Sequence, residues 1–464
     1  MPPIPLLLPG SVLYFFVYLA FGSLWPFIPV MWREKGMSDH EVGLLAAIKP
    51  TSDLFVGPII CAFLDKHSVQ QEALYGLIVL FAFTRSSVLI ARGFLALAAV
   101  EAASSLSHGP ISSLMDAAAV ASFGSGGYGI QRSWGAIGYG IAALVSGFVH
   151  DYTGTYDGVV MVFAAALLVS SVAARSVPVG GTGKASGGRD GKELPIERPA
   201  SRDSHQSNVE EIVEYRPASP DEPTDTQLQT QEEVGTGALT RDQEPHEEEH
   251  GVVTTLWIMF STPQHISFFT AVICSGMCRG FIETFLFVWL HELGGSNVVM
   301  GSAGLVMSFA EAPFFYLVGP FIRAVGPRNV VILAQIGFLI RFIIYSVLQT
   351  PWWVLPVEIL HGLTYASLWA ATTDYSHGIA PAHLRTTMRA TAAGLKGGLG
   401  YGLGVVIGGV MYSGLGPRLC FLSFTALPSL SLLLLVGVRQ NKSGGSYEEQ
   451  GPEEDDLEGW ESRS

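Results

Sequence analysis

Charged residues are scarce in this sequence, and cysteines are few. Asp, Glu, Lys and Arg make up 14% of the 464 residues, whereas hydrophobic residues make up 49%. This proportion leaves too little polar surface to cover a soluble globular protein, so that class is excluded. The four cysteines (Cys61, Cys274, Cys278 and Cys420) all fall within apolar stretches, which argues against extracellular disulfides.

Motifs for nucleotide, metal and catalytic chemistry are also missing. The segment GGTGK at 180–184 faintly resembles a phosphate-binding loop, but Ala185 stands where Ser or Thr is required and no strand precedes it. Cys274 and Cys278 have no histidine or second cysteine pair nearby, so we expect core packing and no metal site. No nucleophile, histidine and orienting acid gather together. The sequence therefore predicts no enzyme, no cofactor and no nucleic-acid partner.

Long apolar stretches, by contrast, are abundant. Twelve stretches of about 18 to 28 residues are long enough to cross a hydrocarbon core of roughly 30 Å as helices. They lie near 9–32, 40–64, 73–91, 94–120, 128–150, 156–175, 264–291, 298–322, 328–348, 351–377, 387–413 and 417–438. The sequence thus predicts an all-α membrane protein with twelve transmembrane helices, six in each half.

Two hydrophilic segments carry the negative charge. Of the formal net charge of −14, residues 176–255 contribute −10 and residues 440–464 contribute −6, which leaves +2 for the rest. The first segment is rich in Pro, Gly, Ser and Glu and cannot bury enough apolar area to fold alone. We expect an N-terminal six-helix half (1–175), a disordered acidic linker (176–255), a C-terminal six-helix half (256–438) and a disordered acidic tail (439–464).

Basic residues in the short loops favour one orientation in the membrane. If both termini are cytoplasmic, the inner side carries Lys66, Arg323, Arg328, Arg385, Arg439 and Lys442, and the outer side carries Arg33, Lys35, Arg92 and Arg418. The excess is modest and has the expected sign. No charged leader or cleavage site precedes the first apolar run, so we expect that run to be a span. Which membrane holds the protein stays open.

The two halves repeat the same features in the same order. Arg85 in the third span matches Arg341 in the ninth. Further matches are Gly57-Pro58 with Gly319-Pro320, His108-Gly109 with His361-Gly362, and Gly138-Tyr139-Gly140 with Gly400-Tyr401-Gly402. Matches of this kind predict parallel six-span repeats related by an axis along the membrane normal.

These features resemble the major facilitator superfamily. The loop after the second span keeps Asp65 and Lys66 of its loop signature, with Cys61 at the usual first glycine and Gln70-Gln71 in place of a basic pair. Segments that resemble its proton-coupled oligosaccharide and nucleoside symporters are YGIQRSWGAIGYG (128–140), SFAEAPFF (308–315), EILHG (358–362) and ATAAGLKGGLGYGLG (390–404). The likeness extends to its domain-containing protein 6 group, covers both halves, and implies the major facilitator fold and secondary transport.

Ionisable side chains inside predicted spans are costly and usually functional. Glu311 lies near the middle of the eighth span, Arg341 in the ninth, and Glu358 and His361 in the tenth. The resemblance implies that these four residues handle a coupling proton, although Glu358 precedes the histidine by three residues instead of following it. The alternative for His361 is a hydrogen-bonded role in helix packing.

A second group of residues is expected to hold the solute. The resemblance places Asp116, Arg132 and Tyr139 where a sugar is bound, and an Arg fork beside a carboxylate can hydrogen-bond adjacent hydroxyls while a ring covers the apolar face. The alternative is an ion pair that ties two helices together. Glu283, four residues after Arg279, lies in a span that lines the cavity of that superfamily and is a further candidate.

A third group in the first half is interpreted as structural. Lys49 and Asp53 stand four residues apart and can pair on one helix face, with Arg85 on the next span. The sequence as a whole predicts a proton-coupled symporter of a small polar, sugar-like or nucleoside-like solute, with protons and the lipid bilayer as further partners. The alternative is a transporter-shaped receptor or scaffold that acts through its acidic cytoplasmic segments.

Overall fold

The computed structural model describes residues 9–67, 69–175, 177 and 244–438, and within these ranges every regular element is a helix. The described residues up to 177 and those from 246 to 438 belong to one compact unit. Most of the expected linker (178–243) and the expected tail (439–464) lie outside the described residues, together with Arg439, Lys442 and the GGTGK segment. The linker and the tail therefore stay predictions.

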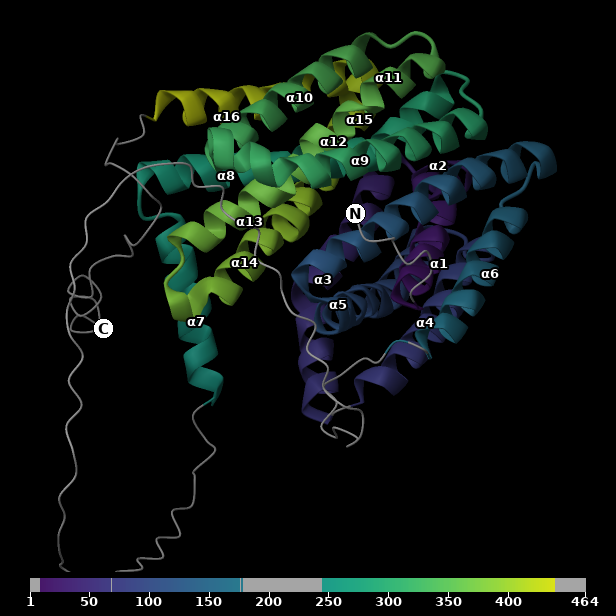
Figure 1. The fold of residues 1–464 in the computed structure, drawn as a ribbon. Helices are drawn as coiled ribbons and strands as arrows, with labels where there is room; N and C mark the ends of the chain where they lie inside the picture. The colour runs from purple at the N-terminus through teal and green to yellow at the C-terminus, as the bar shows by residue number, and fades with distance from the viewer. Residues whose placement is uncertain (1–8, 68, 176, 178–243, 439–464) are drawn as a thin grey trace, which may run out of the picture. The chain divides into compact units, whose positions relative to one another are not determined.

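The helices of the first half follow the predicted spans (Figure 1). The first span is α1 (Pro9–Leu24), continued through the 3-10 turn Trp25–Phe27 into α2 (Ile28–Glu34). The others are α3 (Asp39–His67), α4 (Gln70–Ser86), α5 (Phe94–Thr153), which covers the fourth and fifth spans, and α6 (Asp157–Ala174).

Helix α5 is assigned as one run of 60 residues, yet it contains two spans. Arg132 follows Asp116 by 16 residues, which would separate the two by about 24 Å in a straight helix. Instead Arg132 Nη1 lies 3.6 Å from Asp116 Oδ2. On the neighbouring α1, Tyr14 donates to Asp116 at 2.6 Å and Ser11 donates to Gln131 at 2.8 Å. The chain therefore reverses between residues 116 and 132, as expected between two spans.

The second half begins earlier than the sequence predicts. Helix α7 spans Glu244–Met259, so the last residues of the expected linker of 176–255 are helical. The reason is the apolar run from Val252 onward, in which residues 255, 258 and 259 are buried. This corrects the expected boundary at residue 255.

The remaining spans are built from both continuous and broken helices. Spans seven to nine are α8 (Pro263–Glu292), α9 (Asn297–Val325) and α10 (Pro327–Val347). The tenth is α11 (Val354–Glu358), α12 (Leu360–Gly362), a π-helical turn (Leu363–Ser367) and α13 (Leu368–Ile379). The last two are α14 (Arg385–Gly394), a π-helical segment (Leu395–Gly400), α15 (Tyr401–Phe424) and α16 (Ala426–Gly437). Within α15, Gly416 has a φ of +75°, and this break separates spans eleven and twelve.

The outer surface of these helices is apolar. In the described part of the chain, seven helical stretches are long and apolar enough to cross a membrane, and one of them, Arg385–Gly437, is 53 residues long and covers two predicted spans. Large apolar side chains also face outward, with Phe83 exposed by 78% and Leu95 by 82%. Such a surface is stable against lipid and unfavourable against water.

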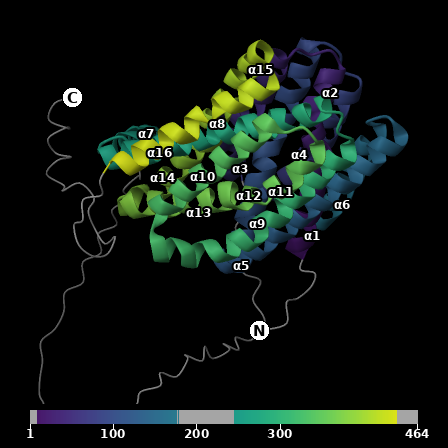
Figure 2. The same cartoon turned by 90° about the horizontal axis from the view of Figure 1, so that it is seen from above.

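The two halves pack against each other through α3 with α15 and through α5 with α9, which lie side by side in Figure 2. Glycines allow this close approach. A Cβ on Gly43 of α3 would lie 2.5 Å from the Val405 carbonyl oxygen, and one on Gly147 of α5 would lie 2.3 Å from the Asn297 carbonyl oxygen. One contact lies near the start of α3 and the other near the end of α5, and they hold those ends together.

Candidate functional site

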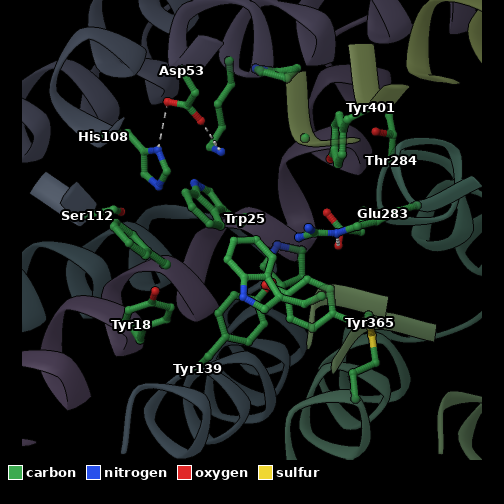
Figure 3. A pocket seen from close by; sticks show the side chains of 18 of the residues that line it. Tyr18, Trp25, Asp53, His108, Ser112, Tyr139, Glu283, Thr284, Tyr365 and Tyr401 are labelled. Carbon is green, nitrogen blue, oxygen red and sulfur yellow. Dashed lines mark hydrogen bonds and ion pairs between the residues drawn. The ribbon is translucent and has the colours of Figure 1, made fainter. Parts of the chain in front are cut away.

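A cavity of about 1000 Å³ opens between the two halves, and residues of both halves line it. Figure 3 shows Asp53, His108 and Tyr18 on the side of the first half, facing Glu283, Tyr365 and Tyr401 on the side of the second. Glu311 and His361 also reach this cavity. Charged groups inside a membrane protein are tolerated where they face such a space or one another.

Arg341 is the centre of a buried network behind the cavity wall. Its guanidinium, 1% exposed, donates to Glu358 at 2.8 Å, to the Thr364 hydroxyl at 2.8 Å and to the Tyr345 hydroxyl at 3.0 Å. Tyr345 in turn donates to the second oxygen of Glu358. A buried ion pair is stable only when its remaining donors and acceptors are satisfied in this way.

His361 joins this network to the cavity. Its Nδ1 lies 3.4 Å from Arg341 Nη1, and its Nε2 lies 3.1 Å from Glu311 Oε1. A guanidinium can only donate, so Nδ1 accepts and the ring proton sits on Nε2, pointing at Glu311. His361 thus stands between the Arg341 guanidinium on one side and the Glu311 carboxylate, which lines the cavity, on the other.

A glycine brings these two helices together. Gly362 follows His361 directly, and a Cβ at that position would lie 2.4 Å from the Ala310 carbonyl oxygen and 2.3 Å from the Phe314 ring. Only a residue without a side chain lets α12 approach α9 so closely. Because Glu311 follows Ala310, this contact sets the distance between the carboxylate and the imidazole.

The expected solute-binding pair also forms. Besides its ion pair with Arg132, Asp116 accepts the hydrogen bond from Tyr14, and Tyr139 lines the same cavity. The Arg132 guanidinium lies 5.9 Å from the centre of the Trp369 ring, which comes from the other half. The pair is thus open to the cavity and is flanked by rings from both halves.

Across the cavity, Arg279 donates to Glu283 at 2.6 Å along one face of α8. The Arg279 guanidinium also lies 4.4 Å from the centre of the Tyr365 ring and 6.0 Å from that of Tyr401. A cation over an aromatic face gains about 0.5–2 kcal/mol, depending on how far it is desolvated. These contacts hold Glu283 in the cavity wall with its charge compensated.

The first half contributes two further ion pairs. Lys49 Nζ lies 3.0 Å from Asp53 Oδ2, and His108 Nδ1 lies 3.5 Å from Asp53 Oδ1. Arg85 donates to Glu101, and both of these side chains are buried. Arg85 and Glu101 line the cavity as well.

The acids of the cavity differ in their partners. Asp53, Glu101, Asp116 and Glu283 each have a lysine or arginine within 4 Å. In the described part of the chain, Glu311 is the cavity acid whose ion-pair partner is a histidine alone. No lysine or arginine of the described residues lies within ion-pair distance of this carboxylate.

Comparison with known proteins decides the family. The sequence profile of the MFS_1 like family matches residues 8–423. The chain belongs to the MFS_1 like family. Maltose permease of Geobacillus stearothermophilus is 21% identical over 437 residues, which cover 93% of this chain and 94% of the permease. Major facilitator superfamily domain-containing protein 6-like of Danio rerio is 26% identical over 172 residues, 37% of this chain and 32% of that protein.

Solved structures give the same fold. The nucleoside transporter NupG superposes with a TM-score of 0.65 at 13% identity, covering 92% of this chain and 97% of that one. A bacterial homologue of the lysosomal transporter Spinster, in an inward-facing and unoccupied conformation, gives a TM-score of 0.58 at 14% identity, covering 92% and 91%. The predicted twelve-helix fold and the resemblance to the major facilitator superfamily are thereby confirmed. This member of the MFS_1 like family is a multi-pass membrane protein and a secondary transporter, not an enzyme.

Two residues of the family's loop signature lie away from the cavity. Asp65 and Lys66 are exposed at the end of α3, where Asp65 accepts a hydrogen bond of 3.1 Å from Gln70. Both residues lie in the last turn of α3, just before the predicted loop, and their role in the loop signature stays a prediction.

Sequence reasoning missed three participants. Glu101 is the acid that pairs with Arg85, Tyr345 bridges Arg341 and Glu358, and Trp369 faces Arg132 from the other half. A signal for Glu101 existed, because Arg85 repeats Arg341 and a buried arginine requires a carboxylate on a neighbouring span. Nothing in the sequence marks Tyr345 or Trp369 among the many aromatic residues.

Proposed function

We propose that this transporter is a proton-coupled symporter that moves a small polar solute, sugar-like or nucleoside-like, by alternating access. The observation that carries the proposal is the Glu311–His361 pair at the cavity wall, with Arg341 directly behind it. A proton that enters from the cavity would meet Glu311, which is the acid among the described cavity-lining residues that has no lysine or arginine within 4 Å. Binding it removes a net charge from the cavity before the protein changes conformation.

Release of the proton would depend on Arg341. A cation that approaches a carboxylate favours its ionised form. In our proposal, α10 moves relative to α9 and α12 as the two halves rock, and Arg341 moves toward Glu311. The buried contacts of Arg341 with Glu358 and Tyr345 would set the position from which this movement starts.

The solute would lie between the two charged pairs. Asp116 with Arg132 and Glu283 with Arg279 present donors and acceptors from opposite halves, and Tyr139, Tyr365 and Tyr401 present rings. Hydroxyl groups suit the charged pairs, and the flat face of a sugar or base suits the rings. The names of two similar proteins, a maltose permease and a nucleoside transporter, favour the same class of solute.

Alternating access would require the contacts between the halves near the start of α3 and the end of α5 to break. One contact is the ion pair of Arg33 with Glu292 at 3.1 Å. Another is Asp151, which accepts from the backbone N–H groups of Asn297 and Val298 at 3.0 Å each. Asp151 thus caps the N-terminus of α9 from the other half, a place where a negative charge is favourable.

The orientation and the flanking segments complete the proposal. We infer from the loop charges that both termini, the acidic linker and the acidic tail would be on the cytoplasmic side. The contacts described above would then close the outer ends, and the cavity would face the cytoplasm. Cysteine labelling from each side of intact cells at exposed Tyr152, substituted as Tyr152→Cys, tests this orientation because the proposal places it outside.

Uptake into proteoliposomes tests the function. A thermal-shift screen with maltose, other sugars and uridine first finds a solute that stabilises the purified protein. Uptake of that radiolabelled solute is then measured with and without an inward acid gradient. We expect accumulation above the external concentration with the gradient alone. A solute that is transported at the same rate with and without the gradient would overturn proton coupling.

A further inference from the structure

The first half contains a histidine site that repeats the one in the second half. His108 Nδ1 lies 3.5 Å from Asp53 on α3, as His361 lies 3.1 Å from Glu311 on α9. In each half the acid comes from the second span and the histidine from the fourth. A purely structural ion pair between Lys49 and Asp53 would not explain this correspondence.

The glycine after each histidine strengthens the correspondence. A Cβ on Gly109 would lie 2.8 Å from Asp53 Oδ1, and a Cβ on Gly362 would contact α9 beside Glu311. In both halves, therefore, the residue that follows the histidine is the point where the acid-bearing helix approaches. The sequence repeat His-Gly and the packing of the acid-bearing helix are two independent observations of one arrangement.

The charges around the two histidines differ, and the difference changes where a proton can bind. The groups that face His108 are Asp53 and Lys49 from α3, Arg85 from α4 and, one contact further, Glu101 on its own helix. The Arg85 guanidinium is directed at Glu101 and Ser104. The described partner of His108 Nδ1 is the Asp53 carboxylate, which can accept a hydrogen bond from a protonated ring nitrogen.

Aromatic rings complete the site. The His108 ring lies 4.7 Å from the ring of Trp25 and 5.0 Å from that of Phe21, and Lys49 Nζ lies 4.9 Å from Trp25. Lys49 pairs with one oxygen of the Asp53 carboxylate, and the other oxygen faces His108. Protonation of His108 then forms an imidazolium beside a carboxylate and over an aromatic face, two partners that both stabilise a cation.

We propose that His108, with Asp53 as its counter-ion, is a second proton-binding site of this transporter, open to the same central cavity. The inference rests on the proposed function, and it assigns one proton to each half. In the first half the proton sits on the imidazole, and in the second half it sits on the carboxylate. The Asp53 carboxylate favours a proton on this ring, whereas the cations Lys49 and Arg85 oppose it.

Trp25 provides a test that needs no transported solute. An imidazolium quenches the fluorescence of an indole that it contacts, whereas a neutral imidazole does so far less. The purified full-length protein is titrated between about pH 8 and pH 5, and the signal of the Trp25→Phe variant is subtracted to isolate Trp25. We expect the Trp25 emission of the wild type to fall in one step on acidification. This step should be absent in His108→Gln and present in His361→Gln.

A second variant covers the case in which His108→Gln fails to fold. In Asp53→Asn the histidine remains and its counter-ion is lost, so the midpoint of the step should move to lower pH by one unit or more, a tenfold weaker proton affinity. Emission of Trp25 that is constant over this range in the wild type, or a step that persists in His108→Gln, would overturn the proposal.

Charge movement tests whether the site belongs to the transport cycle. Proteoliposomes adsorbed on a solid-supported membrane receive an acid jump without solute, and the displaced charge is recorded. We expect His108→Gln and Glu311→Gln each to lose part of it, and the double variant to lose all. A displacement that His108→Gln leaves unchanged contradicts the second site, whereas one that Glu311→Gln leaves unchanged contradicts the proposed coupling residue.

Discussion

The two halves of this transporter place a histidine at corresponding positions and surround it differently. In the second half, Arg341 lies beside one ring nitrogen of His361, and Glu311 lies beside the other. In the first half, Arg85 is directed at Glu101, and His108 faces the Asp53 carboxylate, whose other oxygen pairs with Lys49. In our proposal, the proton binds to the acid in the second half and to the histidine in the first.

The comparison also shows how a repeat can diverge without losing its packing. Both buried arginines keep an acid on the following span, and both histidines keep the glycine at the helix contact. The halves differ in whether the buried arginine contacts the histidine: Arg341 lies beside His361, whereas Arg85 is directed at Glu101. The following predictions test this difference, beginning with the largest expected effect.

Removing the titratable acid should abolish coupling. In Glu311→Gln the shape is kept and the charge is lost, so the solute should equilibrate across the membrane without accumulating above the external concentration, while solute exchange continues. The measurement is gradient-driven uptake against counterflow in proteoliposomes. Glu72→Gln, at an exposed acid on α4, is the matched control and should accumulate solute normally. Accumulation that persists in Glu311→Gln would exclude this residue as the coupling site.

Removing the buried arginine should cost the most stability. Arg341→Met leaves Glu358 buried and without its cation, a loss of about 3–5 kcal/mol. The double variant Arg341→Met/Glu358→Leu removes both charges, so its thermal midpoint in detergent should recover most of the loss although coupling stays absent. If the double variant is as unstable as the single one, the ion pair is not what stabilises these helices.

The two glycines should respond unequally. Gly362→Ala forces a Cβ against the backbone of α9 and should destabilise the protein by about 1–3 kcal/mol, whereas Gly109→Ala meets the Asp53 side chain, which can move. Thermal unfolding of the two variants measures the difference. Gly402→Ala, which has open space around it, is the control and should be neutral or slightly stabilising. Equal losses at positions 109 and 362 would contradict the described packing.

The smallest effect is expected at the outer contact. Burial opposes ionisation of Asp151, but the hydrogen bonds from Asn297 and Val298 outweigh it and hold the pKa of that carboxyl below its ordinary value. A lowered pKa means that the contact is fully present above about pH 4 and weakens only as pH falls further. Between about pH 5 and 8, closure should therefore not depend on Asp151 titration.

Spin-label distances measure this closure. Labels at Tyr152→Cys and His291→Cys, both at exposed positions of opposite halves, should report a larger open population when Asp151→Ala removes the helix cap, by about 1 kcal/mol. Asp157→Ala, at the start of α6, serves as the control. A distance distribution that Asp151→Ala leaves unchanged would show that this cap does not hold the halves together.

Much of this architecture could be predicted from the sequence because the signals are local. Apolar length indicates the spans, and the cost of burying a charge marks Glu311, Arg341, Glu358 and His361. The structure brings these four residues into one connected network. Asp116 and Arg132, which the family resemblance implies as solute-binding residues, form an ion pair.

Other features depend on contacts that no local pattern contains. The role of Tyr345 follows from its distance to two charges on different helices, and α7 extends into a segment whose composition predicts disorder. Lys49 and Asp53 satisfy each other on one helix face, so their sequence spacing hides the approach of His108 from α5. Helix packing, set by Gly109, decides this contact.

Infrared difference spectroscopy of the purified protein tests the central claim most directly, because it detects the proton itself. On acidification, the wild type should gain the C=O stretching band of a protonated carboxylic acid, and Glu311→Gln should lack that band. His361→Gln should keep it with a shifted frequency, since the carboxyl loses its hydrogen-bond partner. A band that is unchanged in Glu311→Gln would contradict the account, because the coupling proton would then bind elsewhere.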